Sequence, residues 1–112
     1  MTLFPTRWSI TDEQKKRLTS TLVSDLKLLR AKANITQDDL AGVIGISRQS
    51  YCQIENGNKE MPWNIYLSLI FLFSVVKDTS KLIHTLGVYP DDFIKQVNGN
   101  AYQNNNFAEV QE

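Results

Sequence analysis

Two short helical patterns that meet at Gly45 constrain the fold of this 112-residue chain more than any other feature. Apolar residues recur at helical spacings on both sides of that glycine, and they are Leu40, Ile44, Ile46, Tyr51 and Ile54. Ala41 is small, which lets a second helix cross closely. Glycine readily adopts the positive φ of a tight turn. Residues 37–55 are therefore predicted to form two helices joined by a turn, with Ser47 capping the second one.

The segment before this pair has the pattern of one long helix. Thr11 and Gln14 stand at the spacing of a capping box, and Thr36 and Asp39 repeat that spacing before the next element. One apolar face lies between the two boxes and comprises Leu18, Leu22, Leu26, Leu29 and Ala33. This face predicts a helix over about 12–32, with Asn34 as its left-handed stop. Three adjacent hydroxyl residues, 19–21, are a candidate break in it.

The remainder of the chain is also predicted to be helical. Pro62 suits the first turn of a fourth helix, Thr79 or Ser80 starts a fifth that ends at Gly87, and Pro90 opens a sixth. We find no alternating strand pattern, so an all-α fold is expected. Residues 98–112 are rich in asparagine and poor in aliphatic residues, so they are expected to be a disordered tail. The predicted division is an arm and helix start (1–19), a core domain (20–76), C-terminal helices (77–97) and the tail (98–112).

Composition excludes several classes of protein. Twelve basic and twelve acidic residues give no net charge, which argues against a histone-like protein and against an acidic disordered chain. The single cysteine cannot form an intrachain disulfide and suits a reducing compartment, so a cytoplasmic location is expected. The first ten residues lack the pattern of a signal peptide. The longest uncharged run, residues 61–76, is shorter than the roughly 20 residues that span a bilayer.

The helix pair and its surroundings resemble the lambda-repressor-like, Xre-type helix-turn-helix family. The resemblance covers about half of the chain and is carried by Leu26, Leu29, Arg30, Ile35, Thr36, Gln37, Leu40, Ala41, Gly45, Ile46, Ser47, Ile54, Glu55, Asn56, Gly57 and Pro62. It implies a compact five-helix bundle, here with extra C-terminal helices. It also implies a regulator of transcription, with no cofactor, that binds double-stranded DNA at pseudo-palindromic operators as a homodimer. Two departures are Tyr51, where the family has a small aliphatic residue, and an unusually apolar fourth helix.

The third helix is the candidate for reading DNA bases. If Tyr51 and Ile54 face inward, the opposite face carries Arg48, Gln49, Ser50 and Gln53, with Cys52 near it. Arginine can donate two hydrogen bonds to guanine, and glutamine can pair with adenine. This face has no carboxylate, which phosphate would repel. The alternative is an ordinary solvated helix face.

A second set of residues is predicted to contact the DNA backbone. The resemblance implies this role for Gln37, and helix N-termini offer free N–H groups to phosphate. The further candidates are Ser47, Ser50, Asn56, Asn58 and Lys59, for which ordinary loop polarity is the alternative. Residues 1–60 hold nine basic and seven acidic groups, and residues 61–112 hold three and five. The proposed DNA-binding half is therefore the more positive half, by a small margin.

Two predictions concern structure and partners. The resemblance implies a structural ion pair between Arg30 and Glu55, and each would need a partner if buried. In the fourth helix the resemblance places Leu67, Ile70 and Phe71 inward. That leaves a second apolar stripe as a dimer or partner surface, namely Ile65, Leu69, Leu72, Phe73 and Val76. The C-terminal helices, a second subunit, or both would cover this stripe.

The inventory of reactive groups gives no basis for an enzyme or a metal site. His84 and Cys52 are single residues on separate predicted helices, and no glycine-rich phosphate loop occurs. Redox control through Cys52 has no support without a lowered thiol pKa. The competing functional hypothesis is a protein-interaction module, such as an antitoxin or a phage-type accessory factor, that binds another protein through the apolar fourth helix.

Overall fold

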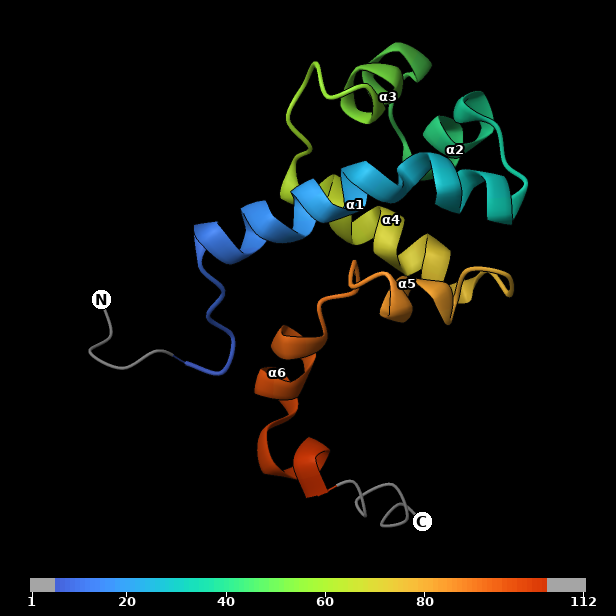
Figure 1. Ribbon diagram of the computed structural model, residues 1–112. Helices are drawn as coiled ribbons and strands as arrows, with labels where there is room; N and C mark the ends of the chain where they lie inside the picture. Colours follow the sequence, from blue (N-terminus) through green and yellow to red (C-terminus); the bar gives the residue numbers. More distant parts are fainter. Residues whose placement is uncertain (1–5, 105–112) are drawn as a thin grey trace.

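The computed structural model describes residues 6–104, with side-chain exposure described for residues 6–99. Its elements are α1 (Asp12–Ala33), α2 (Gln37–Ile44), α3 (Arg48–Glu55), α4 (Trp63–Val75), α5 (Leu82–Thr85) and α6 (Asp91–Asn104). The described residues contain no strand, so the predicted all-α fold is confirmed. In Figure 1, α1 and α4 cross each other. Helices α2 and α3 lie on one side of this pair, and helices α5 and α6 lie on the other.

Helix α1 begins and ends where the local signals place it. The Thr11 side chain accepts a hydrogen bond from the Gln14 backbone, and Gln14 Oε1 accepts one from the Thr11 N–H at 2.8 Å. Asn34 ends the helix with φ 55°. The expected break at residues 19–21 is wrong. The hydroxyls of Thr19 and Thr21 donate to carbonyls within the helix, at Lys16 and Arg17, so they compete little with the helical backbone.

The turn between α2 and α3 has the predicted geometry. Gly45 has φ 86°, and its N–H donates to the Ala41 and Gly42 carbonyls at the end of α2. The Ser47 side chain then caps α3 by accepting from the Ser50 N–H at 3.0 Å. A reversal of the chain within three residues sets the two short helices against each other.

The core lies between α1 and α4 and is closed on one side by α2 and α3. Its fully buried side chains include Leu22, Leu26, Leu29, Leu40, Tyr51, Tyr66, Leu69 and Phe73. Tyr51 and Ile54 face inward as predicted. Tyr66 also reaches the far side, because its hydroxyl donates to the Val88 carbonyl after α5 at 2.7 Å.

The predicted orientation of α4 is wrong. Ile65, Leu69 and Phe73, which were expected on a partner surface, are buried in the core, while Leu67 and Phe71, which were expected inside, are exposed. Ile70 is buried as predicted, and Leu72 and Val76 are half-buried. The cause is the sequence of the helix itself. No charged residue occurs between Glu60 and Lys77, and the small polar residues Asn64, Ser68 and Ser74 define the rotation of the helix only weakly.

The C-terminal helices contribute unequally to the core. In α5, Ile83 is fully buried and Leu82 packs against the core, as does Leu86, which follows the helix as its C-cap. In α6, Phe93, Ile94 and Val97 are half-buried. The Gln96 side chain of α6 donates to backbone carbonyls of the N-terminal arm, at 2.9 Å to Arg7 and 2.6 Å to Ser9. Helix α6 thus tethers the arm to the C-terminal part of the chain.

The expected boundary of the C-terminal tail is also wrong. Helix α6 continues past Asn98 to Asn104, with a kink at Gly99, where φ is 57° and ψ is −139°. The Asn98 side chain donates to the Ile94 carbonyl at 2.8 Å, which extends the hydrogen bonding of the helix. The rest of the predicted tail, 105–112, and the first five residues of the arm lie outside the described residues. Within the described residues, no helix combines the length and apolarity needed to cross a membrane.

Candidate nucleic-acid interface

One face of α3 projects away from the protein. Arg48, Gln49 and Gln53 are exposed, and Ser50 is half-buried. The opposite face is anchored in the core by Tyr51 and Ile54. The predicted base-reading residues therefore share one outward face on a helix whose rotation is fixed by buried side chains.

The N-terminus of α3 adds hydrogen-bond donors to this face. Ser47 accepts the Ser50 N–H through its side-chain oxygen, so its own hydroxyl hydrogen is left to donate elsewhere. The first N–H groups of a helix carry a partial positive charge that favours anions. Ser47 and α3 together thus provide a local geometry compatible with a phosphate.

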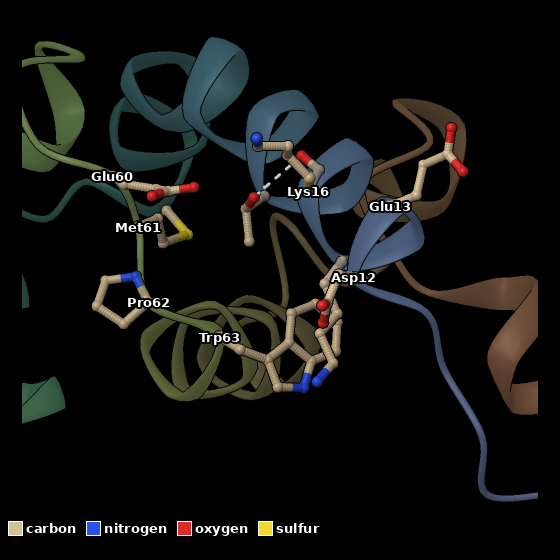
Figure 2. A pocket seen from close by; sticks show the side chains of 9 residues that line it. Asp12, Glu13, Lys16, Glu60, Met61, Pro62 and Trp63 are labelled. Carbon is tan, nitrogen blue, oxygen red and sulfur yellow. Dashed lines mark hydrogen bonds between the residues drawn. The ribbon is translucent and has the colours of Figure 1, made fainter.

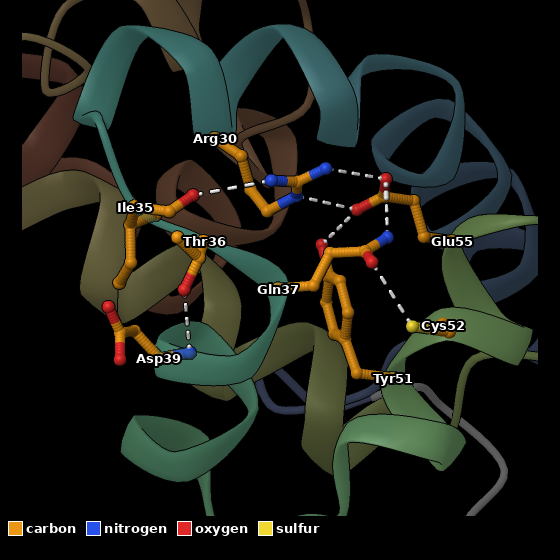
Figure 3. Close-up of polar contacts among 8 residues, drawn as sticks. All are labelled: Arg30, Ile35, Thr36, Gln37, Asp39, Tyr51, Cys52 and Glu55. Carbon is orange, nitrogen blue, oxygen red and sulfur yellow. Dashed lines mark hydrogen bonds and ion pairs between the residues drawn. The ribbon is translucent and has the colours of Figure 1, made fainter.

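A polar network beneath the helix joins α1, α2 and α3 (Figure 3). Arg30 on α1 donates from Nε to Oε1 of Glu55 at 2.8 Å and from Nη2 to Oε2 at 2.9 Å. Its third group, Nη1, donates to the Ile35 carbonyl between α1 and α2 at 3.3 Å. The Glu55 side chain is fully buried. The predicted ion pair between Arg30 and Glu55 is confirmed, and it is bidentate.

Glu55 stays charged although it is buried. Burial alone raises the pKa of its carboxyl, but hydrogen bonds from Arg30 and Tyr51 and the charge of Arg30 outweigh burial, so the pKa is lowered. The hydrogen bond to Glu55 raises the pKa of Arg30. Both partners are therefore held in their ionised forms, and the only acidic side chain of α3 is withheld from the outward face.

Tyr51 has a polar role that the sequence analysis missed. Its hydroxyl donates to Glu55 Oε1 at 2.6 Å, one helical turn along α3. Burial, together with Glu55, raises the pKa of this phenol, so it remains a neutral donor. The sequence signal for this hydrogen bond was the spacing of four residues between Tyr51 and Glu55, which places both side chains on one face of a helix. Tyr51 thus packs in the core and also stabilises the buried carboxylate.

Gln37 is turned toward this network. Its Nε2 donates to Glu55 Oε2 at 3.2 Å, and its Oε1 accepts from the Cys52 thiol at 3.2 Å (Figure 3). One Nε2 hydrogen is left over from these contacts, since the amide carries two. The predicted phosphate contact of Gln37 therefore depends on that hydrogen and stays a prediction.

The remaining predicted backbone contacts follow the end of α3. Asn56, Asn58 and Lys59 are all exposed, and Asn56 is the C-cap of the helix. The backbone N–H groups of Asn58 and Lys59 both bond to the Gln53 carbonyl, at 2.9 and 3.1 Å, which fixes the start of this loop. These three side chains lie at the opposite end of α3 from Ser47.

A cavity of about 680 Å³ lies elsewhere on the protein (Figure 2). It is formed by the N-terminal half of α1 and the segment that leads into α4, and no residue of α3 lines it. The Trp63 ring stacks on Tyr66 at 4.6 Å between ring centroids, and the Lys15 ammonium lies 5.7 Å from its centroid. Three acidic residues and two lysines line it, so it lacks the excess of positive charge that favours phosphate.

The anchored pair of helices, the tight turn and the exposed outward face of α3 define a helix-turn-helix protein. Comparison with known proteins agrees. A family model described as a helix-turn-helix domain matches residues 24–99. An uncharacterized HTH-type transcriptional regulator of Methanocaldococcus jannaschii is 37% identical over 67 residues, which are 60% of this chain and 92% of the relative. No solved structure matches the chain. The chain therefore belongs to the helix-turn-helix family of transcriptional regulators, and the resemblance drawn from the sequence is confirmed.

Proposed function

We propose that this protein is a sequence-specific repressor of transcription that binds a pseudo-palindromic operator as a homodimer. In this proposal α3 enters the major groove, and Arg48, Gln49 and Gln53 contact base edges. The proposed phosphate contacts come from Gln37, Ser47, Ser50, Asn56, Asn58 and Lys59. The observation that carries the proposal is the exposed, carboxylate-free face of α3 on a helix fixed by buried side chains.

The chemistry of the outward face favours base reading over simple attraction to phosphate. Arg48 can donate two hydrogen bonds to guanine O6 and N7, and Gln49 can exchange two with adenine. Each such pair contributes about 1–3 kcal/mol of discrimination against the wrong base. The chain has no net charge, so general attraction to the DNA backbone is modest and the base contacts must supply much of the preference.

Repression follows from the size of the DNA segment that a dimer would occupy. Two α3 helices in successive major grooves lie about 34 Å apart, one turn of DNA. A dimer bound in this way blocks other proteins from the same segment. We therefore propose repression by occupancy, in the cytoplasm.

Selection of bound sequences from a random DNA pool tests the base-reading assignment. Wild-type protein should enrich a single motif with two related half-sites. Arg48→Ala and Gln49→Ala should each relax the preference at specific positions, while Lys95→Ala on α6 serves as a matched surface control and should select the wild-type motif. If both α3 variants select the unchanged motif, or if the wild type enriches nothing, the proposal is wrong.

A further inference from the structure

A patch of exposed apolar side chains covers adjoining parts of α2 and α4. Val43 is 62% exposed, Leu67 46%, Phe71 68% and Val75 60%. With the half-buried Ile44 and Leu72 these residues form what we call the α2–α4 patch. Several of them line a hollow of about 440 Å³. Phe71 is the most exposed large apolar side chain in the described part of the chain.

The α4 part of the patch is a single row. Leu67, Phe71 and Val75 are separated by four residues each, so they follow one line along the helix surface over about 12 Å. Phe71 stands at the centre of the row with one aliphatic residue on each side. A second α4 that runs in the opposite direction, centred on the same Phe71, therefore presents nearly the same order of side chains: aliphatic, aromatic, aliphatic.

We propose that the α2–α4 patch binds the same patch of a second copy of this chain, with the two α4 helices antiparallel and the two Phe71 side chains near the twofold axis. The homodimer itself is part of the proposed function, and this inference assigns its interface. In such a contact Leu67 of one copy lies against Val75 of the other. Both copies then bury the same apolar surface.

The distribution of charge favours a second copy as the occupant. A twofold contact brings residues near the axis against their own counterparts, so a charge there would meet its like. No charged residue occurs on α4, and the charged residues of α2, Asp38 and Asp39, lie in its first turn, ahead of the patch residues Val43 and Ile44. Antiparallel packing also directs Lys77, just after α4 in each copy, toward the start of the other α4, which Glu60 precedes by three residues, and both residues are exposed. A strongly charged peptide would find no opposite charge within the patch.

The position of the patch is compatible with DNA binding. Its residues come from α2 and α4, and none comes from α3. A second copy seated there leaves the outward face of α3 free. Stable interfaces take about 20–30 residues from each side, so the six patch residues would form the apolar centre, surrounded by polar neighbours. A dimer that dissociates measurably on dilution is expected.

Sedimentation velocity of the full chain without DNA, over a range of concentrations, tests the interface. The wild type should sediment as a dimer at high concentration. Phe71→Glu should sediment as a monomer, because two carboxylates would meet at the axis. Leu28→Glu makes the same change at an exposed leucine on α1 and should remain a dimer. Circular dichroism should show unchanged helicity in both variants.

A charge pairing experiment distinguishes a twofold contact from any other. Phe71→Lys alone should also be monomeric, but an equimolar mixture of Phe71→Glu and Phe71→Lys should form a heterodimer. A dimeric Phe71→Glu variant, a wild type that is monomeric at high concentration, or a mixture that stays monomeric would each overturn the proposal. So would a different protein that binds the wild type in equal amount at this patch in place of the second copy.

The outcome is separable from that of the proposed function. Sedimentation is measured without DNA, and Arg48→Ala should remain dimeric while its DNA preference changes. A monomeric wild type that still selects a DNA motif rejects the interface and leaves base reading by α3 in place. A wild type that forms the dimer but selects no DNA motif rejects base reading by α3 and leaves the interface in place.

Discussion

Tyr51 and Glu55 lie one turn apart on α3, and the phenol donates a 2.6 Å hydrogen bond to a carboxylate that Arg30 holds from α1. The same carboxylate accepts from Gln37 at the start of α2. One buried side chain thus determines how the helix with the exposed face is held against two others. The outward face of α3 depends on this network for its orientation.

Removing the phenol hydroxyl should weaken the fold measurably. Hydrogen bonds to charged groups contribute about 1.5–3 kcal/mol, so Tyr51→Phe should lower the free energy of unfolding by about that amount. Tyr66→Phe is the matched control, because the hydroxyl of Tyr66 donates to the neutral Val88 carbonyl and should contribute about 1 kcal/mol. Urea unfolding monitored by circular dichroism measures both. Equal losses in the two variants would contradict a special role for the charged acceptor.

Breaking the ion pair should cost more than losing the phenol. Arg30→Met leaves a buried carboxylate without its charged partner, and such a loss costs about 3–5 kcal/mol. Because Arg30 is itself partly exposed, we expect the lower end of that range. The double variant Arg30→Met with Glu55→Leu should recover part of the loss, since no unpaired charge remains. Guanidinium unfolding at neutral pH is the measurement, and a double variant less stable than Arg30→Met alone would contradict the explanation.

The stability of the protein should fall in acid because of Glu55. Its pKa is lowered in the folded state from the ordinary value of 4.5, so the unfolded chain binds the proton more readily. The stabilisation is complete above that ordinary value and is lost as the pH falls through the folded pKa. Unfolding free energies measured between pH 3 and pH 7 should therefore fall less steeply for Glu55→Gln than for the wild type. Parallel curves for the two proteins would show that Glu55 does not contribute.

Much of the fold could be predicted from the sequence because its determinants are local. Thr11, Asn34 and Gly45 each act on the backbone within a few residues, so the helix ends and the turn were placed correctly. The inward position of Tyr51 followed from helical spacing. The rotation of α4 could not be predicted in this way, because a helix with no charged residue and only a few small polar ones is oriented mainly by what packs against it. The inward turn of Gln37 depends on Glu55 and Cys52 from another helix, and no single pattern along the chain encodes that contact.

Base contacts and phosphate contacts should respond differently to salt. Arg48→Ala should weaken binding to the selected operator by about 1–3 kcal/mol and relax the preference at one position. Lys59→Ala should weaken binding to all sequences by a similar factor and reduce the slope of log affinity against log salt by about 1. Fluorescence titrations of operator and unrelated DNA at several salt concentrations measure both effects. A Lys59→Ala variant with an unchanged salt slope would remove that residue from the phosphate contacts.

The tight turn offers a test of backbone strain alone. Gly45 has φ 86°, and a Cβ atom added there meets no other atom within 4 Å, so any cost of Gly45→Ala comes from the left-handed conformation. That cost is about 1–2 kcal/mol for an ordinary residue. Gly45→Asn should cost less than Gly45→Ala, because asparagine tolerates this conformation better. Gly42→Ala, within α2 and also free of close neighbours, should stabilise the protein by up to about 1 kcal/mol. Thermal unfolding of the three variants should show this order, and a Gly45→Ala variant as stable as the wild type would mean that the turn relaxes without strain.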